Sequence, residues 1–206
     1  MTVPATQPRF GAQDYLAWEA EQAEKHEYLD GEVFARGGVC DASEAGASEA
    51  HVTVAGNFFM ALRNHLRGGP CSVFISDMKL HVQAGNAYLY PDVFVTCAEA
   101  DRAQSHAKSA PSLVAEVLSP ATSAYDRGAK FAAYRKLPSL REYALIDPGR
   151  LSVDLFRRDE QGRWVLYPFE PGAQVEFASI DLRLPIEALY EDVRFEDAPA
   201  LRTGHP

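Results

Sequence analysis

The run AYLYPDVFVTC (Ala87 to Cys97) and the run PSLVAEVLSP (Pro111 to Pro120) decide the fold of this chain. Both are rich in Val, Leu, Phe and Tyr and are bounded by turn-forming residues, which indicates two strands joined by a polar loop. Each run carries one acid, Asp92 in the first and Glu116 in the second. An unpaired buried carboxylate is costly, so each acid must be paired, exposed at a strand end or bound to a cation. If the strands are neighbours, one cation can satisfy both acids.

Helices and strands are predicted on both sides of these two runs. The apolar spacing predicts a surface helix over 14–29, and a second helix that is capped by Ser48 and ended by Gly68. The further predicted elements are strands at 32–35, 71–76, 79–83 and 142–147, a helix at about 124–137, hairpin strands at 151–157 and 163–169, and a short helix at 185–190. No repeat or linker divides the chain, which predicts one domain over 1–206, with a core at about 10–190 and frayed tails.

The composition is that of a soluble globular protein, with 206 residues of which 47% are apolar and 24% charged. No run approaches the roughly 18 apolar residues of a membrane span, and the N-terminus lacks the apolar stretch of a signal peptide. We therefore expect a cytoplasmic protein without a membrane partner. The three cysteines, Cys40, Cys71 and Cys97, are widely spaced and form no Cys-x-x-Cys pair. This predicts reduced, mostly buried thiols and neither a disulfide framework nor a zinc site. Cys97 and Met78 are both expected in the core.

The charge is acidic overall and unevenly spread. A formal net charge of −9 argues, taken alone, against a partner that is itself an anion. Residues 14–32 carry seven acids against one lysine, whereas residues 127–141 carry five basic residues and no acid. The basic segment is either a local basic surface or a solvated helix face.

A third chemical group lies on the helix that follows Glu116. Asp126, Lys130 and Tyr134 recur every four residues, so they share one helix face. Two carboxylates and a lysine suit phosphodiester hydrolysis: Asp92 and Glu116 would hold a hard cation such as Mg²⁺ or Mn²⁺, and the lysine would orient water or neutralise developing charge. By spacing alone, a structural ion pair is the competing interpretation.

Several motifs follow one another in a characteristic order: YPDV, AEVLSP, D-R-x-x-K-x-x-x-Y (Asp126 to Tyr134) and REYALIDP (Arg141 to Pro148). With EKHEYLDGEV (Glu24 to Val33) and His51 inside the second helix, the sequence resembles the Uma-two family of restriction endonucleases, within the PD-(D/E)xK nuclease superfamily. The resemblance runs from about residue 10 to 190. It implies an α/β protein with a restriction-endonuclease-like core, a mixed β-sheet flanked by helices, to which the strands at 151–169 add an extra C-terminal β-hairpin.

The resemblance also implies roles for individual residues. Asp92 matches the aspartate of the PD motif and Glu116 the second acid, and both would bind the metal together with the backbone carbonyl of Val117. Two residues after Glu116 stands Leu118 and not the lysine of the family pattern. The lysine role then passes to the helix, where Lys130 is the candidate.

Secondary candidates for the site are Glu27, His51, Asp77, Asp126 and Tyr134. Glu27 is either a third metal-binding carboxylate or one surface acid among several. His51 either approaches the site or hydrogen-bonds locally at the helix start. Asp77 is expected to cap a turn in preference to lying beside the metal, and Tyr134 to pack the helix.

Two functions fit these residues. The first is a Mg²⁺-dependent DNA endonuclease, for which a homodimer is expected from symmetry and from the cutting of duplex DNA. The second is a non-catalytic nuclease-fold protein with an interaction or regulatory role, which the net charge and the absence of a DNA-reading motif allow. Metal dependence separates the two.

Overall fold

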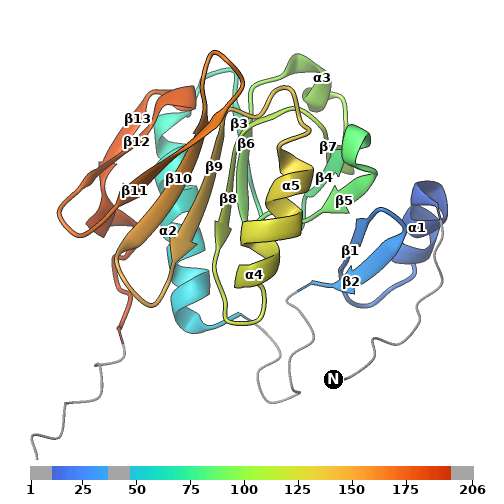
Figure 1. The fold of residues 1–206 in the computed structure, drawn as a ribbon, viewed down its shortest axis with the longest axis horizontal. Coiled ribbons are helices and arrows are strands. Elements are labelled where there is room, and N and C mark those ends of the chain that lie inside the picture. Colours follow the sequence, from blue (N-terminus) through green and yellow to red (C-terminus); the bar gives the residue numbers. More distant parts are fainter. Residues whose placement is uncertain (1–10, 37–46, 196–206) are drawn as a thin grey trace, which may run out of the picture.

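The computed structural model describes residues 11–36 and 47–195, and a six-stranded sheet forms its centre (Figure 1). The strand order is β11-β10-β9-β8-β6-β3. β8 pairs with β9 in parallel and with β6 in antiparallel orientation, so the sheet is mixed. The strands are β3 (Ser72–Ile75), β6 (Val93–Thr96), β8 (Pro111–Val117), β9 (Glu142–Asp147), β10 (Ser152–Arg158) and β11 (Trp164–Phe169).

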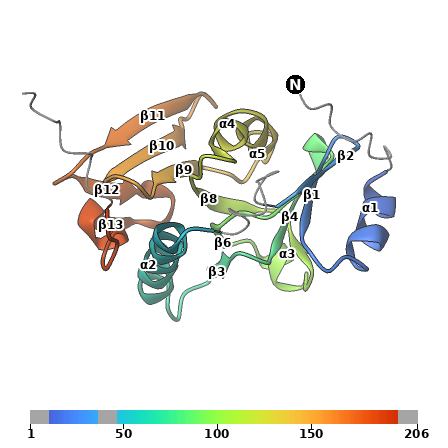
Figure 2. The same cartoon turned by 90° about the horizontal axis from the view of Figure 1, so that it is seen from below.

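Helices cover both faces of this sheet (Figure 2). One face packs on α2 (Glu49–His65), which begins as predicted because the Ser48 hydroxyl accepts the N–H of His51 at 3.2 Å. The other face is covered by one run of helix with no break between its parts: α4 (Ser123–Tyr125), η2 (Asp126–Lys130) and α5 (Phe131–Tyr134). No helix within the described residues is long and apolar enough to cross a membrane.

A second, five-stranded sheet has the order β2-β1-β5-β4-β7. Its elements and their connections are α1 (Ala12–Glu19), β1 (His26–Leu29), β2 (Glu32–Ala35), β4 (Lys79–Val82), η1 (Gln83–Gly85), β5 (Ala87–Leu89), α3 (Glu99–Arg102) and β7 (Ala107–Lys108). The predicted strand at 87–97 is thus two strands in two sheets, β5 and β6. The break falls at Pro91, which has no N–H to give to a ladder. Consequently Asp92 stands where the chain enters the main sheet.

The C-terminal region adds two hairpins. β10 and β11 pair in antiparallel orientation, as predicted, and extend the main sheet. Beyond them β12 (Gln174–Phe177) and β13 (Leu182–Pro185) form a separate pair, followed by η4 (Ile186–Leu189), a 3₁₀ turn where a short helix was predicted. A 3₁₀ turn, η3 (Ala178–Ile180), joins β12 to β13. The predicted fold class, an α/β protein with a mixed sheet flanked by helices and a C-terminal hairpin, is confirmed.

The helix predicted over 14–29 is wrong in its second half. α1 ends at Glu19, and residues 26–29 form β1, whose Leu29 pairs with Glu32. The residues between them, Asp30 and Gly31, have φ of 50° and 91°. Asp-Gly with two positive φ angles is the preferred two-residue turn of a β-hairpin. This turn, together with the pairing of β1 with β5, outweighs the helical spacing.

The prediction of reduced, buried cysteines is also wrong. Cys71 and Cys97 form a disulfide, and Cys97 is exposed instead of packed in the core. The cause is the register of β3 and β6, in which Ser72 faces Thr96, so the residues just outside this pair lie opposite each other. Met78 does pack against an apolar cluster, as predicted. Cys40 lies outside the described residues.

Candidate active site

Asp92 and Glu116 meet at one edge of the main sheet, as predicted for neighbouring strands. Val93 faces Ala115 across β6 and β8, which places the two acids beside each other. The N–H of Asp92 lies 3.4 Å from Glu116 Oε2, and the N–H of Val117 donates to Asp92 Oδ2 at 2.8 Å. Each acid thus touches the strand that carries the other.

Lys130 reaches the same point from the helix above β8. Its Nζ lies 3.0 Å from Glu116 Oε1, 3.1 Å from Glu27 Oε1 and 3.7 Å from Asp126 Oδ1. The helix is a π-helix over Asp126–Lys130, and such widened turns are frequent at functional sites. The side chains of Lys130 and its three acidic partners are all buried.

Leu118 explains why the lysine does not come from β8. Side chains alternate along a strand, so Leu118 points to the same face as Glu116. That face is apolar beyond the acid, because Leu118 belongs to a buried cluster with Phe131 and Tyr134. A lysine at this position would be buried among apolar groups, whereas Lys130 finds three carboxylates.

Glu27 reaches the site from β1, not from a helix end as predicted. Its Oε1 accepts the N–H of Tyr90 at 2.8 Å as well as the Lys130 ammonium. Because Tyr90 lies between β5 and β6, this bond ties the five-stranded sheet to the site. Glu27 is buried, so the interpretation as a surface acid does not hold.

Tyr134 and Asp126 complete the buried part of the site. The Tyr134 hydroxyl donates to Glu116 Oε1 at 2.9 Å, so this tyrosine contacts the site in addition to packing the helix. The backbone carbonyl of Asp126 accepts the Tyr143 hydroxyl at 3.0 Å, which fixes the widened helical turn over β9.

His51 and Arg36 approach the second carboxylate oxygen of Asp92. His51 Nε2 lies 3.4 Å and Arg36 Nη2 lies 3.7 Å from Asp92 Oδ1. His51 therefore does reach the site, and its buried Nδ1 has no hydrogen-bond partner among the described residues. Sequence reasoning missed Arg36, whose only signal is its place between a strand and a Gly-rich segment. Asp77 is exposed and pairs with Arg36 at 3.2 Å, so it joins the site only through that arginine.

Burial and neighbouring charges shift the pKa values of Glu116 and Asp92 in opposite directions. Burial, together with Asp92, Asp126 and Glu27, raises the pKa of Glu116 well above its usual range, although Lys130 opposes the rise. Burial also pushes the pKa of Asp92 upward, but His51, Lys130 and the N–H of Val117 outweigh it and hold that pKa below its usual value. Glu116 therefore retains a proton to higher pH than Asp92.

Lys130 stays charged because the acids around it outweigh the effect of burial. Burial alone would lower the pKa of its ammonium, but Glu116, Glu27, Asp126 and Asp92 outweigh burial and raise that pKa well above 10.5. The site thus holds a permanent cation within a group of four acids. The carboxylates outnumber the lysine, which leaves negative charge for a further cation.

The donor set fits a hard divalent ion. Carboxylate oxygens of Asp92 and Glu116 are the ligands that Mg²⁺ and Mn²⁺ prefer, and Mg²⁺ is often bound by one or two carboxylates with water completing its shell. Within residues 11–36 and 47–195, no group of three or more His, Cys, Asp or Glu side chains is arranged to hold a metal ion. The fit therefore rests on two carboxylates, with Lys130 occupying the space toward Glu27.

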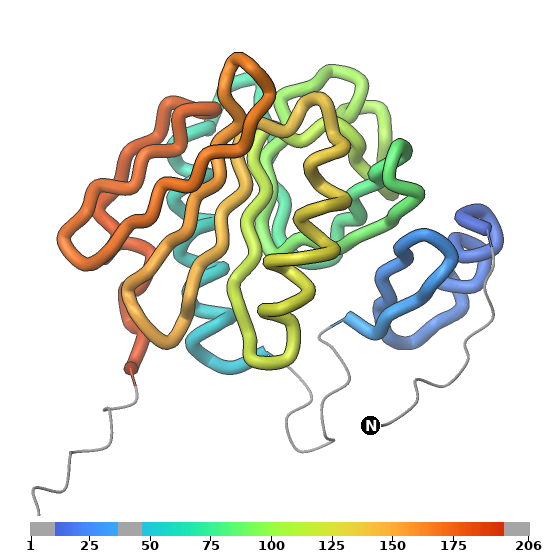
Figure 3. Tube along the Cα trace, in the orientation of Figure 1, coloured from blue at the N-terminus to red at the C-terminus, as the bar shows by residue number. Residues whose placement is uncertain are grey.

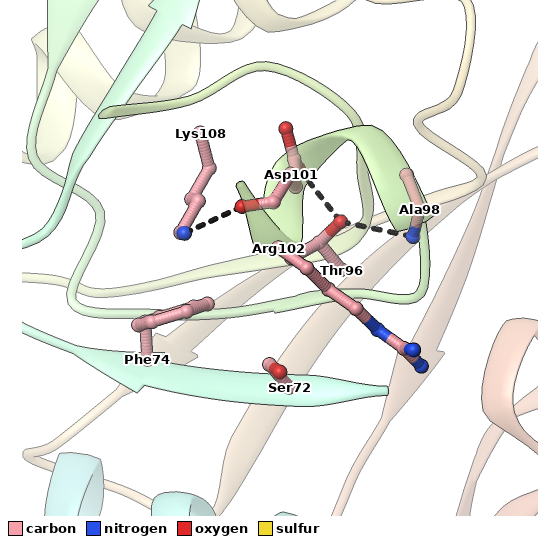
Figure 4. Close-up of a pocket in the computed structure, with 7 residues that line it drawn as sticks. All are labelled: Ser72, Phe74, Thr96, Ala98, Asp101, Arg102 and Lys108. Atoms are coloured by element: carbon pink, nitrogen blue, oxygen red, sulfur yellow. Dashed lines mark hydrogen bonds between the residues drawn. The ribbon is translucent and has the colours of Figure 1, made fainter. Parts of the chain in front are cut away.

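A separate hollow of about 210 Å³ lies between β3, β6 and α3 (Figure 4). The buried Asp101 accepts the Thr96 hydroxyl at 2.7 Å and the N–H of Ser109 at 2.9 Å. The ammonium of Lys108 donates to the carbonyl of Asp101 at 2.6 Å. The buried charged groups of this hollow are thus already bonded inside the protein.

The mixed sheet and its flanking helices match a nuclease-like fold. A solved structure described as "a putative nuclease belonging to DUF820" from Anabaena variabilis ATCC 29413 superposes with a TM-score of 0.71. The superposed regions are 18% identical and cover 88% of this chain and 98% of the solved chain. This similarity establishes the fold alone.

The chain belongs to the Uma2 family, described as "Putative restriction endonuclease", whose pattern matches residues 12–187. Two Synechocystis sp. proteins are relatives over nearly their whole length. The uncharacterized protein slr1290 is 36% identical over 188 residues, which are 91% of this chain and 95% of that protein. The uncharacterized protein sll1609 is 34% identical over 182 residues, or 86% and 98% of the two chains.

Proposed function

We propose that this protein is a divalent-metal-dependent DNA endonuclease that hydrolyses phosphodiester bonds with Asp92, Glu116 and Lys130. The observation that carries the proposal is the contact of Lys130 Nζ with Glu116 Oε1 at 3.0 Å, beside Asp92. An aspartate, a glutamate and a lysine from three different elements meet at one edge of a nuclease-like sheet. A purely structural ion pair requires only one acid for one lysine.

In this proposal Asp92, Glu116 and the backbone carbonyl of Val117 hold Mg²⁺ or Mn²⁺. The family's description as a restriction endonuclease supports a divalent ion, because restriction-endonuclease-like families generally use one. When bound, such an ion would polarise the phosphate and make water a stronger nucleophile. The N–H of Val117 donates to Asp92 Oδ2 at 2.8 Å and so orients the carboxylate, while Oδ1 faces His51 and Arg36.

Lys130 acts on water and on developing charge. Its ammonium remains protonated, so it orients the attacking water and stabilises negative charge on the phosphate without exchanging its own proton. Glu27 and Asp126 position the ammonium, and Tyr134 positions Glu116. His51 lies at the side of Asp92 where the substrate would enter.

DNA is proposed as the substrate despite the net charge of −9. The basic segment 127–141 does not form one basic face, because Lys130 is buried and Arg127 pairs with Asp154 at 2.8 Å. Phosphate contacts near the site fall instead to Arg36 and Lys79, whose charges lie 5.8 Å and 5.9 Å from the centroid of the Tyr90 ring.

A plasmid-nicking assay with Mg²⁺ or Mn²⁺ tests the proposal, with titration calorimetry of Mn²⁺ in parallel. We expect Lys130→Ala to abolish cleavage yet keep metal affinity nearly normal, because the ammonium does not bind the cation. Lys130→Arg should restore little cleavage, since the planar guanidinium group cannot replace the compact ammonium group. The matched control is Lys136→Ala, an exposed lysine of the same segment, which should cut normally.

Two outcomes would overturn the assignment. If Lys130→Ala cuts at the wild-type rate while Asp92→Asn does not, the lysine role belongs elsewhere. If the wild type cuts no DNA with either ion, the protein is the non-catalytic nuclease-fold module.

A further inference from the structure

Among the described residues, β11 is an edge strand of the main sheet and exposes three consecutive apolar side chains. Val165 is 39% exposed, Leu166 46% and Tyr167 40%. Figure 3 traces the β10–β11 hairpin (orange) along one side of the molecule. The strand sequence WVLYPF holds no charged residue, and of the devices that protect natural edges it has only Pro168. Such an edge is suited to pairing with a strand of another chain.

The hydrogen bonds of the hairpin show which main-chain groups of β11 face outward. The N–H of Asp159 donates to the carbonyl of Arg163 at 2.8 Å, so this pair is bonded across the hairpin. Bonding alternates along an antiparallel pair, and the odd-numbered residues of β11 therefore bond to β10. The even-numbered residues Trp164, Leu166 and Pro168 point their main-chain groups outward. Pro168 lacks an N–H on that outer side, where a sheet tolerates proline.

We propose that two copies of this chain pair through β11, in antiparallel orientation, about a two-fold axis at Leu166. The N–H and carbonyl of Leu166 then bond to those of Leu166 of the partner subunit. The N–H of Trp164 donates to the carbonyl of the partner's Pro168. Because proline has no N–H, this pair forms one hydrogen bond and not two. The two main sheets become one continuous sheet.

The side chains support this register. Residues opposite each other across the axis share a face, so Val165 meets the partner's Tyr167 and Leu166 meets the partner's Leu166. A β-branched residue opposite an aromatic one is a favourable cross-strand pair. All three exposed apolar side chains thereby gain an apolar partner in a single arrangement. A second copy of β11 supplies these partners by symmetry, whereas an unrelated strand need not.

Charge at the ends of the strand fits the same arrangement. β11 is preceded by Arg163 and followed by Glu170. Antiparallel pairing brings the end of β11 that carries Arg163, which also pairs with Asp159 at 2.7 Å, beside the end of the partner's β11 that carries Glu170. Parallel pairing would place like charges side by side. Two copies that each carry −9 repel elsewhere on their surfaces, so an uncharged strand with opposite charges at its ends is where they can approach.

Sedimentation velocity over a range of micromolar concentrations tests the pairing. We expect the wild type to form a dimer and Leu166→Lys to sediment as a monomer, because two ammonium groups would meet at the axis. Gln161→Lys in the hairpin turn adds the same charge and should leave the dimer intact, and circular dichroism shows that each variant is folded. A monomeric wild type, or a dimer that Leu166→Lys does not dissociate, would overturn the proposal.

Disulfide trapping tests the register, in a Cys40→Ser background. Leu166→Cys should cross-link two copies, because the paired α-carbons would lie about 5.5 Å apart. Val165→Cys should not, since two copies of this residue are offset by two positions, about 7 Å along the strand. Adding Tyr167→Cys to Val165→Cys should restore the link. Equal cross-linking by Val165→Cys alone would refute the register, and none of these readouts depends on nuclease activity.

Discussion

Replacing Lys130 by Met removes the ammonium that lies 3.0 Å from Glu116 and 3.1 Å from Glu27 and leaves both carboxylates buried. Removing one partner of a buried ion pair costs about 3–5 kcal/mol, because the remaining charge is uncompensated. Methionine fills a similar volume and leaves little cavity. We expect the free energy of unfolding to fall by about 3 kcal/mol or more near neutral pH.

The loss should depend on pH because Glu116 can take up a proton. Its folded-state pKa is raised well above the ordinary 4.5. A group whose pKa is higher in the folded state stabilises fully below its unfolded pKa, and this stability is lost as pH rises through the folded pKa. Lys130 lowers the pKa of Glu116, so the pKa rises further in the variant. The destabilisation should therefore be smaller at about pH 5 than at about pH 8.

Urea unfolding followed by circular dichroism at the two pH values measures both effects. The matched control is Arg127→Met on the same helix, which breaks the partly exposed ion pair with Asp154, worth at most about 1 kcal/mol. A Lys130→Met variant no less stable than the Arg127→Met control, or equally destabilised at both pH values, would refute the reasoning.

Asp92→Asn should weaken Mn²⁺ binding by at least about tenfold while changing stability little, because the amide still accepts the N–H of Val117; unchanged affinity by calorimetry would contradict this. Mn²⁺ binding should release protons, since the cation displaces the proton that the raised pKa of Glu116 retains. Calorimetry in buffers of different ionisation enthalpy measures the number of protons released. No proton release on Mn²⁺ binding would contradict this prediction. Cys71→Ala should lower the free energy of unfolding by about 2–4 kcal/mol, because it opens the link to Cys97. Labelling of all three cysteines of the folded wild type without reductant would disprove that link.

Sequence alone was sufficient for features whose signals are local. Ser48 and the apolar spacing after it specify α2, and the alternation of β10 and β11 specifies their hairpin. The meeting of Asp92 and Glu116 was also predictable, because a charge within an apolar strand conflicts with its surroundings and needs a partner there. The shared helix face of Asp126, Lys130 and Tyr134, and the Leu118 that stands in place of a lysine, pointed to Lys130, whose catalytic role stays a prediction.

Tertiary structure decided the features that depend on which segments meet. The chain from His26 to Leu29 is a strand because β5 lies beside it, although its spacing suits a helix. Cys71 meets Cys97 only because β3 pairs with β6. Arg36 and Glu27 reach the site from a second sheet, which no pattern within one segment predicts. A residue type limits what a side chain can do, whereas its pKa and its partners are set by atoms distant in sequence, and only packing brings those atoms together.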